Sequence, residues 1–358
     1  MSGEAHARVH GGVDADEIEA LGLDPAAIVD FSTNVNPFGP HPAVAAAIRE
    51  APIDRYPDAE ARRARRALAD LLDLPTERIV VGAGAAELLW LAARALLHRG
   101  DAAVVVAPTF SELGIAAGRA GARVVEWRAS AADEFRIDLE AVSRVIDAEG
   151  ARLLSLCTPN NPTGAAPSFD AIAAVAARHP RTSILLDESY LALSERHADA
   201  GKPLPDNVLR VRSLTKEHAI PGVRVGYAIA APELVRRLEA ERPAWPVGTA
   251  AQAAVVAACR ESAFVAESRA RLLEGRDVLA ARLRAIGLAP LRSLGPFLLF
   301  EVPIPATELR LRLLRGHGIL VRDATSFGLP HHVRIGVRIG AEADRFVTSL
   351  RAELAEAR

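Results

Sequence analysis

Residues 183–190 read SILLDESY, and residues 208–216 read VLRVRSLTK. Each stretch begins as a short strand-like run and ends in polar residues. Asp187 is the last residue of the first run, and Lys216 is the last residue of the second stretch. In an open α/β sheet, ligands bind at the edge formed by the carboxyl ends of the strands. A carboxylate in that position is costly unless a cation meets it. The two stretches therefore predict a ligand site that brings a carboxylate and a lysine to one sheet edge.

Similar runs continue along the chain and alternate with helical stretches. They are rich in Val, Ile and Leu and lack strict alternation, which predicts strands covered on both faces. Strands are predicted at 79–81, 102–107, 123–127, 153–157, 183–187, 208–213 and 224–229, with helices between several of them at 85–97, 139–148 and 169–178. Strand–helix–strand order predicts an α/β fold, with a three-layer αβα large domain around a mostly parallel sheet.

The pattern changes after about Trp245. A long Ala- and Arg-rich stretch at 249–286 precedes short strands and helices at 297–302, 306–315, 319–321, 333–337 and 341–357. This part predicts a smaller α+β C-terminal domain. The segment before residue 50 resembles neither part. We therefore expect an N-terminal arm and small-domain segment at 1–50, a large domain at 51–245 and a small domain at 246–358.

Composition excludes several classes of function. Half of the 358 residues are apolar, which is enough for a sizeable core, and the net charge of −2 gives no electrostatic footprint for nucleic acid or an anionic membrane. Apolar runs such as 102–107 are too short to cross a bilayer, and MSGEAHARVHGG has no apolar signal core. Cys157 and Cys259 make neither a disulfide framework nor a metal-cluster spacing, so we predict a cytoplasmic protein without a metal.

Two lysines, Lys202 and Lys216, are the only side-chain primary amines in the chain. The expected sheet edge also receives the loop TPNNPTG at 158–164 and the turn GAGAAE at 82–87. A small-residue turn into a helix forms an anion site from backbone N–H groups and the helix dipole. A lysine for an aldehyde, a carboxylate for a pyridine nitrogen and a phosphate cradle are the parts that pyridoxal phosphate needs.

Several motifs resemble those of the fold-type I, class I/II aminotransferases, which use pyridoxal phosphate. These are Asn-Pro-Thr-Gly at 161–164, Asp-Glu-Ser-Tyr at 187–190, and Ser-Leu-Thr-Lys at 213–216 followed by Gly-Val-Arg-Val-Gly-Tyr at 222–227. They occur in the family's order, and the resemblance extends from Asp30 to the C-terminal helix. It implies an enzyme whose large domain, at 51–245, holds the cofactor.

The resemblance implies a role for each matched residue. Lys216 would form the Schiff base with the cofactor and move a proton, and Asp187 would pair with the pyridine nitrogen. Asn161 and Tyr190 would bond the ring hydroxyl oxygen, and Phe110 would stack on the ring. The phosphate would be held by the turn and its surroundings: Gly84, Ala85, Ala86, Ser213 and Arg224.

Two further matches concern the partner subunit and the substrate. Tyr56, in Arg-Tyr-Pro-Asp, matches a tyrosine that reaches the cofactor phosphate of the other subunit. This implies a homodimer with the active site at the subunit interface. Arg334 matches the arginine that binds the substrate carboxylate, a task that suits its planar fork. The predicted partner is thus a small amino acid or amine.

Within the family, the chain resembles the histidinol-phosphate aminotransferase and threonine-phosphate decarboxylase branch. His10 in His-Gly-Gly, the stretch 30–40 that contains Asn36, and Arg338 in one strand with Arg334 favour the decarboxylase. Arg322 matches a position that binds the distal phosphate of the substrate. Substrate-binding roles are therefore predicted for Arg334, Arg322, Asn36 and His10.

The chain departs from the branch at three places. Ala83 replaces the Asn of Gly-Asn-Gly, the stretch 243–248 loses an Asn, and Glu217-His218 replaces an aromatic pair. These departures fall where the decarboxylase differs from its relatives, which favours amino transfer. Decarboxylation of L-threonine O-3-phosphate, a step of cobalamin biosynthesis, stays open as the second reaction.

A third alternative is a non-catalytic sensor or interaction protein with this fold. A DNA-binding regulator needs a further domain, for which residues 1–30 are too short, and an interaction protein would not require the lysine, carboxylate, amide and tyrosine together. Single positions also keep simpler interpretations. Asp187 can be a turn carboxylate, the stretch 84–87 an ordinary strand–helix turn, Arg322 and Arg338 edge-strand residues, and His10 part of a flexible arm.

Overall fold

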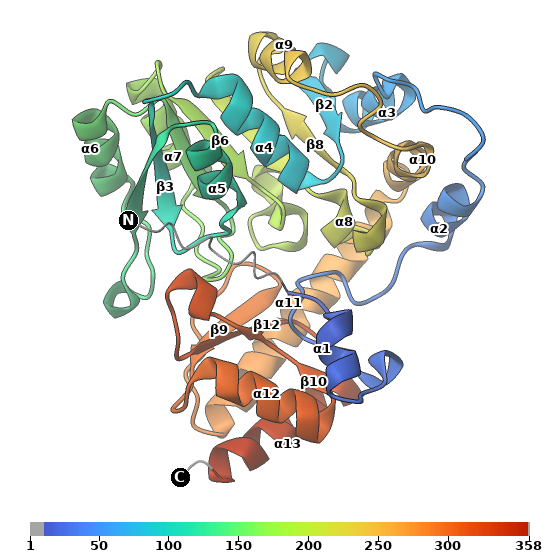
Figure 1. Ribbon diagram of the computed structural model, residues 1–358, viewed down its shortest axis with the longest axis vertical. Helices are drawn as coiled ribbons and strands as arrows, with labels where there is room; N and C mark the ends of the chain where they lie inside the picture. Colours follow the sequence, from blue (N-terminus) through green and yellow to red (C-terminus); the bar gives the residue numbers. More distant parts are fainter. Residues whose placement is uncertain (1–10, 357–358) are drawn as a thin grey trace. The chain divides into compact units, whose positions relative to one another are not determined.

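The computed structural model describes residues 11–356 (Figure 1). Contacts divide the chain into two compact units, each made of separate segments. The larger unit comprises Val35–Leu273 and Arg292–Pro296. The smaller comprises the residues up to Asn34 together with Glu274–Leu291 and Phe297–Arg358. These units place α10 (Thr249–Ala258) and the first half of α11 (Ser262–Ala285) with the larger unit, although the sequence pattern changes near Trp245. The domain limits at 50 and 245 stay a prediction.

A seven-stranded sheet with the order β2-β8-β7-β6-β5-β3-β4 forms the middle layer of the larger unit. Among the described strands of this sheet, only β8 runs antiparallel to its neighbours. This confirms the predicted mostly parallel sheet. The strands are β2 (Ile79–Gly82), β3 (Ala102–Ala107), β4 (Arg123–Arg128), β5 (Leu153–Cys157), β6 (Ser183–Asp187), β7 (Val208–Arg212) and β8 (Gly226–Ile229).

Helices cover both faces of this sheet because successive strand residues point to opposite sides. Leu153 and Leu185 pack in one cluster with α4 (Ala85–Leu96), α5 (Glu112–Arg119) and α9 (Pro232–Ala240). Leu154 and Leu186 pack on the other face with α6 (Leu139–Glu149) and α7 (Phe169–Arg178). Further along, α2 (Pro42–Arg49), α3 (Arg62–Leu72) and α10 (Thr249–Ala258) pack against β2 and β8. The predicted three-layer αβα architecture is thereby confirmed.

Strand β4 corrects one expectation. The sequence predicted strands covered on both faces, but β4 is an edge strand paired only with β3 within the described chain. Only Val125 and Trp127 pack against the core, whereas Val124 is 37 % exposed. The charged residues of the strand, Arg123, Glu126 and Arg128, are exposed. Such polar side chains suit an edge strand.

The smaller unit is an α+β structure around the three-stranded antiparallel sheet β11-β12-β9. Phe31 stacks on Phe346 at 4.7 Å in its core. Its strands are β9 (Phe297–Glu301), β11 (Arg322–Asp323) and β12 (His332–Gly336), with the parallel pair β1 (Val29–Asp30) and β10 (Ile319–Leu320). Its helices are α1 (Ala15–Ala20), α12 (Ala306–His317) and α13 (Ala341–Glu356), with the second half of α11 (Ser262–Ala285).

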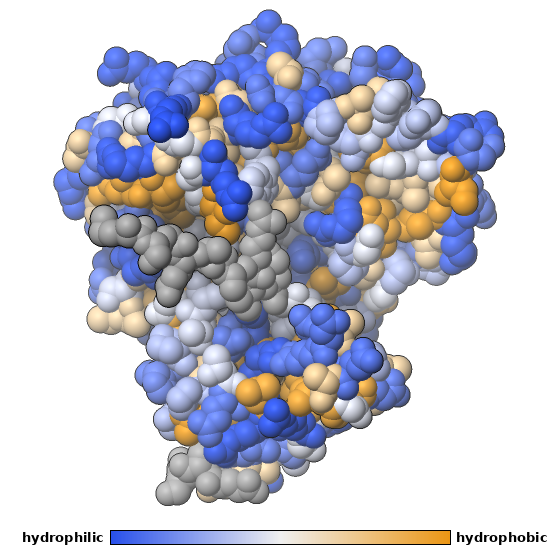
Figure 2. Space-filling model, viewed as in Figure 1, coloured by the Kyte–Doolittle hydropathy of each residue, from blue (hydrophilic) through white to orange (hydrophobic). Residues whose placement is uncertain are grey.

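No helix within residues 11–356 combines the length and the apolar character needed to cross a bilayer. Figure 2 shows a face on which hydrophilic residues predominate and apolar residues form scattered patches.

Candidate active site

The carboxyl ends of β5, β6 and β7 lie at one edge of the large sheet. Cys157 and Asp187, the last residues of β5 and β6, are register partners. Lys216 lies on the short helix α8 (Leu214–Glu217), which follows β7. A pocket at this edge is lined by most of the predicted cofactor residues: Ala85, Ala86, Phe110, Asn161, Asp187, Tyr190, Ser213, Lys216 and Arg224. The structure thus brings together in space residues that come from six separate stretches of sequence.

The turn before α4 forms the anion-binding end of this pocket. Gly84 has a φ of +89°, which glycine adopts without strain. A Cβ on Gly84 would lie 2.7 Å from Nη2 of Arg224, so the glycine leaves room for the guanidinium group. The first N–H groups and the dipole of α4 favour an anion. Ser213 and Thr215 add hydroxyl oxygens 2.7 Å apart. This set of donors suits a phosphate group.

Asp187 forms the acidic end of the pocket. Its side chain is buried, and its Oδ1 accepts hydrogen bonds from Ser189 N at 2.9 Å and Ser189 Oγ at 2.6 Å. Burial raises the pKa of Asp187, and the serine hydrogen bonds and the positive charge of Lys216 oppose this shift. A cationic ring nitrogen bound here would favour the ionised carboxylate. The fixed carboxylate is therefore suited to a protonated pyridine.

The loop after β5 holds Asn161 in place through its neighbour. The Nδ2 of Asn160 donates to Pro108 O at 2.8 Å and to Thr163 Oγ1 at 2.9 Å, so this buried amide ties two loops together. Asn161 and Tyr190 are themselves buried, with 6 % and 8 % of their surface exposed. Both line the pocket with polar groups, as binding of a ring hydroxyl requires.

Behind the pocket lies a buried ion-pair network that the sequence analysis did not find. Glu188 follows Asp187, and its side chain is fully buried. Its Oε1 accepts from Arg210 Nε at 2.6 Å, and its Oε2 accepts from Arg212 Nε at 2.7 Å. The alternation of arginines in VLRVR was the available signal, because it places Arg210 and Arg212 on one face of β7.

Glu217 and His218, which replace the family's aromatic pair, are titratable groups directly after Lys216. Burial raises the pKa of Glu217 to about 7 although Arg212 opposes this shift, and burial together with His41 lowers the pKa of His218 to about 4. Oε1 of Glu217 lies 3.8 Å from Nε2 of His218. Burial thus favours the neutral form of both side chains.

Asn36 contacts the backbone of α8. Its N–H donates to Lys216 O at 3.0 Å, and its Nδ2 donates to Glu217 O at 2.9 Å. Its Oδ1 accepts from Phe38 N at 3.1 Å. The Asn36 side chain therefore fixes the segment that carries the lysine. Its predicted contact with substrate stays a prediction.

The smaller unit contains the predicted substrate arginines. Arg334 of β12 and Arg322 of β11 are register partners, and each is 5 % exposed. Arg334 donates to Ser32 O, and Arg338 donates to Asp30 O at 2.6 Å. Buried guanidinium groups held by backbone carbonyls suit recognition of a carboxylate or phosphate.

Asn34 is a candidate that the sequence analysis missed. It is 3 % exposed, and neither its Nδ2 nor its Oδ1 has a hydrogen-bond partner among the described residues. A buried amide without a partner costs free energy, so a ligand that bonds to it would remove the cost. The only available signal was the repeated asparagine in Asn-Val-Asn-Pro.

Two predicted site residues are not among those that line the pocket in the described part of the chain. His10 falls outside the described residues. Tyr56 does not line the pocket and is 77 % exposed, with its ring stacked on Trp245 at 4.6 Å. In residues 11–356, no three or more His, Cys, Asp or Glu side chains are arranged to hold a metal ion.

Comparison with known proteins identifies the family of the chain. The family model for class I and II aminotransferases matches residues 26–350. Histidinol-phosphate aminotransferase of Symbiobacterium thermophilum is 36 % identical over 92 % of this chain and 91 % of that protein. The chain belongs to the class I and II aminotransferase family, and it is an enzyme that depends on pyridoxal phosphate.

Two solved structures show which branch of the family the chain resembles. Histidinol-phosphate aminotransferase from Sinorhizobium meliloti, in complex with pyridoxal-5'-phosphate, has a TM-score of 0.86 and 27 % identity, covering 97 % of this chain and 96 % of that one. L-threonine-O-3-phosphate decarboxylase from Porphyromonas gingivalis has a TM-score of 0.81 and 26 % identity, covering 92 % of this chain and 100 % of that one. The predicted branch of the family is confirmed.

We predict that Glu188→Gln destabilises the protein strongly. It removes the charge that Arg210 and Arg212 share and leaves two buried cations without a counter-ion. Breaking a buried pair in this way costs about 3–5 kcal/mol in the free energy of unfolding, as urea titration would measure. The control is Glu140→Gln, which breaks the exposed pair with Arg178 and should have little effect. Equal losses in the two variants would contradict the role assigned to Glu188.

A second prediction concerns Glu217→Gln and pH. Because the folded state raises the Glu217 pKa from 4.5 to about 7, the unfolded chain ionises first. Stability from the neutral carboxyl is complete below pH 4.5 and is lost as pH rises through about 7. Glutamine stays neutral. The free energy of unfolding of the variant, measured by urea titration, should therefore rise relative to wild type by on the order of 2 kcal/mol between pH 5 and 8.

Urea titrations of Glu140→Gln over the same pH range provide the control for Glu217→Gln. Hydrogen bonding to Arg178 lowers the pKa of Glu140, so its stabilising contribution is lost as pH falls. Glu140→Gln should therefore lose stability relative to wild type as pH rises, the opposite direction from Glu217→Gln. A flat difference for Glu217→Gln would show that its carboxyl is already ionised in the folded protein at pH 5.

Proposed function

We propose that the enzyme transfers the amino group of a small phosphate-bearing amine, with histidinol phosphate as the first candidate. The observation that carries this proposal is the polar cluster of the smaller unit. It includes the buried register partners Arg322 and Arg334, and the buried Asn34, whose amide has no hydrogen-bond partner within residues 11–356. Such groups suit a multiply charged anion. The named activity of the relatives at 32–36 % identity supports the same substrate class.

The pocket of the larger unit fits pyridoxal phosphate. Gly84 leaves the space in which Arg224 lies, so the N-terminus of α4, Arg224 and Ser213 would hold the phosphate. Asp187 would pair with the ring nitrogen, while Asn161 and Tyr190 would bond the ring oxygen and Phe110 would cover the ring. When bound, the cofactor supplies an electron sink for charge that develops on the substrate's α carbon.

The residues of the chain then divide the work between binding and proton movement. Nζ of Lys216 anchors the cofactor and afterwards, as a free amine, accepts the proton from the α carbon of the substrate. The carbonyl bonds from Asn36 hold the Lys216 backbone, which limits the positions that Nζ can reach. Arg334 orients the substrate through a carboxylate or phosphate oxygen. This orientation would decide the reaction, because Arg334 would select whether the substrate's α proton or its carboxylate is the group lost.

Decarboxylation of L-threonine O-3-phosphate is the second candidate. The likeness to the Porphyromonas gingivalis decarboxylase favours it, and so does the arginine pair 334 and 338. It would place the enzyme in cobalamin biosynthesis. Both reactions use the same cofactor residues, so the substrate decides between them. We also propose a cytoplasmic location, which the two free cysteines support.

Lysine substitution tests the cofactor role directly. We predict that Lys216→Ala abolishes the visible absorbance band of the bound cofactor and lowers amino transfer by at least about 1000-fold, since it removes both the anchor and the base. The chain offers one matched control, Lys202→Ala, which removes the only other lysine and should keep the spectrum and the rate. An unchanged spectrum in Lys216→Ala would contradict the assignment.

Two substrate reactions separate the candidate functions. The cofactor-loaded enzyme is first given L-threonine O-3-phosphate without a keto acid, and mass spectrometry follows loss of CO2. It is then given histidinol phosphate with 2-oxoglutarate, and glutamate formation is measured. Transfer without decarboxylation supports the proposal. Catalytic CO2 release instead establishes the decarboxylase.

We propose further that the enzyme is a homodimer with the active site at the subunit interface. Three apolar side chains support this: Ile53, Tyr56 and Trp245 are 93 %, 77 % and 49 % exposed. Thr249 Oγ1 donates to Pro52 O at 2.5 Å and joins the two segments that carry them. Exposed apolar groups of this kind mark contact surfaces.

Light scattering tests the dimer. We predict that the wild-type enzyme has twice the chain mass of 38.0 kDa and that Ile53→Glu weakens association at least about tenfold, because it buries a charge in the contact. Val278→Glu is the control, because Val278 is 48 % exposed on α11 of the smaller unit. A monomeric wild-type enzyme, or equal effects of the two variants, would overturn the proposed interface.

A further inference from the structure

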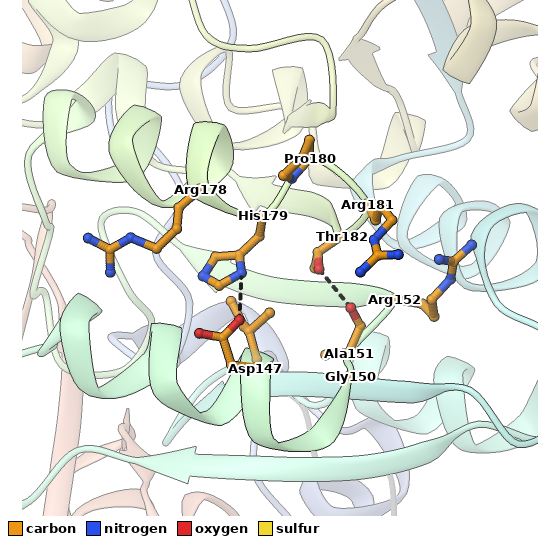
Figure 3. A pocket seen from close by; sticks show the side chains of 10 residues that line it. Asp147, Gly150, Ala151, Arg152, Arg178, His179, Pro180, Arg181 and Thr182 are labelled. Atoms are coloured by element: carbon orange, nitrogen blue, oxygen red, sulfur yellow. Dashed lines mark hydrogen bonds and ion pairs between the residues drawn. The ribbon is translucent and has the colours of Figure 1, made fainter.

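A second pocket lies at the amino ends of β5 and β6, whose carboxyl ends carry the candidate active site. It measures about 340 Å³ and is enclosed by the turns 150–152 and 178–182, together with Ile146 and Asp147 of α6 (Figure 3). Each of the two strands is five residues long. A strand of that length spans roughly 16 Å, so this pocket is separate from the cofactor pocket.

The walls of the second pocket are fixed by their own hydrogen bonds. Thr182 Oγ1 donates to Ala151 O at 2.7 Å and joins the two turns (Figure 3). The imidazole of His179, which is 7 % exposed, has Nε2 2.5 Å from Ser143 Oγ and Nδ1 3.4 Å from Asp147 Oδ1. The buried polar groups of the wall are therefore already partnered.

Carbonyl groups near the helix ends at this pocket accept hydrogen bonds from donors other than the surrounding arginines. Ala151 N donates to Ile146 O at 3.0 Å, which caps α6. Asn207 Nδ2 lies within hydrogen-bond distance of Ala176 O, His179 O and Thr182 O, at 3.0, 3.1 and 2.9 Å. Basic side chains near helix C-termini often serve to bond the last carbonyls. Here the carbonyls of Ile146, Ala176, His179 and Thr182 have other donors.

Two guanidinium groups remain available to a ligand. Arg178 is engaged with Glu140 and points away from the other two arginines in Figure 3. Arg152 and Arg181 come from different turns, are exposed, and extend to the same side of the pocket. Across residues 11–356, neither has an acidic side chain within 4.0 Å. The pocket therefore presents two guanidinium groups that form no ion pair within residues 11–356, over a wall held by its own hydrogen bonds.

We propose that this pocket binds a small phosphorylated molecule, with Arg152 and Arg181 on its phosphate group. The planar guanidinium fork matches phosphate oxygens, and two forks from different turns can hold one group from two sides. Asp147, which lies next to His179 in Figure 3, would be an acceptor for a hydroxyl or amino group of the same molecule. The site is additional to the amino-transfer site and does not depend on the proposed substrate.

Isothermal titration calorimetry with inorganic pyrophosphate tests this site. The cofactor-loaded enzyme is used at matched ionic strength, so that the cofactor's own phosphate site is filled. We expect saturable binding with a Kd at or below about 1 mM, and at least about tenfold weaker binding in the double variant Arg152→Gln/Arg181→Gln. Arg119→Gln is the matched control, because it removes an exposed arginine at the C-terminus of α5.

Three results would overturn the proposal. They are no saturable heat with the wild-type enzyme, equal affinity in the double variant, and a loss of the cofactor's visible absorbance on adding pyrophosphate, which would place binding in the active site. A purely structural role for the arginines would instead lower the thermal midpoint of the double variant without pyrophosphate. It would leave the affinity of the folded variant unchanged.

Discussion

The burial of two adjacent carboxylates at the end of β6 is the constraint on which the larger unit depends. Asp187 and Glu188 both lie at the carboxyl end of an apolar strand, where ionised groups are expensive. The charge of Glu188 is balanced by ion pairs with Arg210 and Arg212 of the neighbouring strand. For Asp187, hydrogen bonds from Ser189 and the positive charge of Lys216 oppose the cost of burial. We propose this fixed carboxylate as the acceptor for the protonated ring of the cofactor.

This division explains why β7 carries charge in the middle of a sheet. Its arginines alternate with Val208, Leu209 and Val211, which pack in the apolar clusters on the two faces. The same strand then leads into α8 and Lys216. The ion pairs that hold Glu188 therefore also fix the strand that delivers the lysine. Because these contacts support both the folded strand and the position of Lys216, a substitution that weakens them is expected to lower both stability and activity.

Sequence alone predicted the parts of this site that follow one another along the chain. β3, β5 and β6 have the predicted bounds, because each is a short apolar run closed by a turn. Asp187, Asn161 and Lys216 could be placed at one edge because the carboxyl ends of parallel strands meet there. The edge position of β4 was missed, although Arg123 and Glu126 signalled it. The long stretch after Trp245 divides at Cys259–Glu261 into α10 and α11, a break that no proline or glycine marks.

The parts that sequence could not predict depend on which atoms remain unpaired after folding. Asn34 and Asn36 are equivalent as residue types, yet Asn36 uses its whole amide on backbone groups and Asn34 uses none of its own within the described chain. Only the folded arrangement distinguishes the structural asparagine from the one available to a ligand. The same argument separates Arg178 from Arg152 and Arg181. In a chain this rich in arginine, residue type alone cannot separate these side chains, whereas their pairing in the folded structure can.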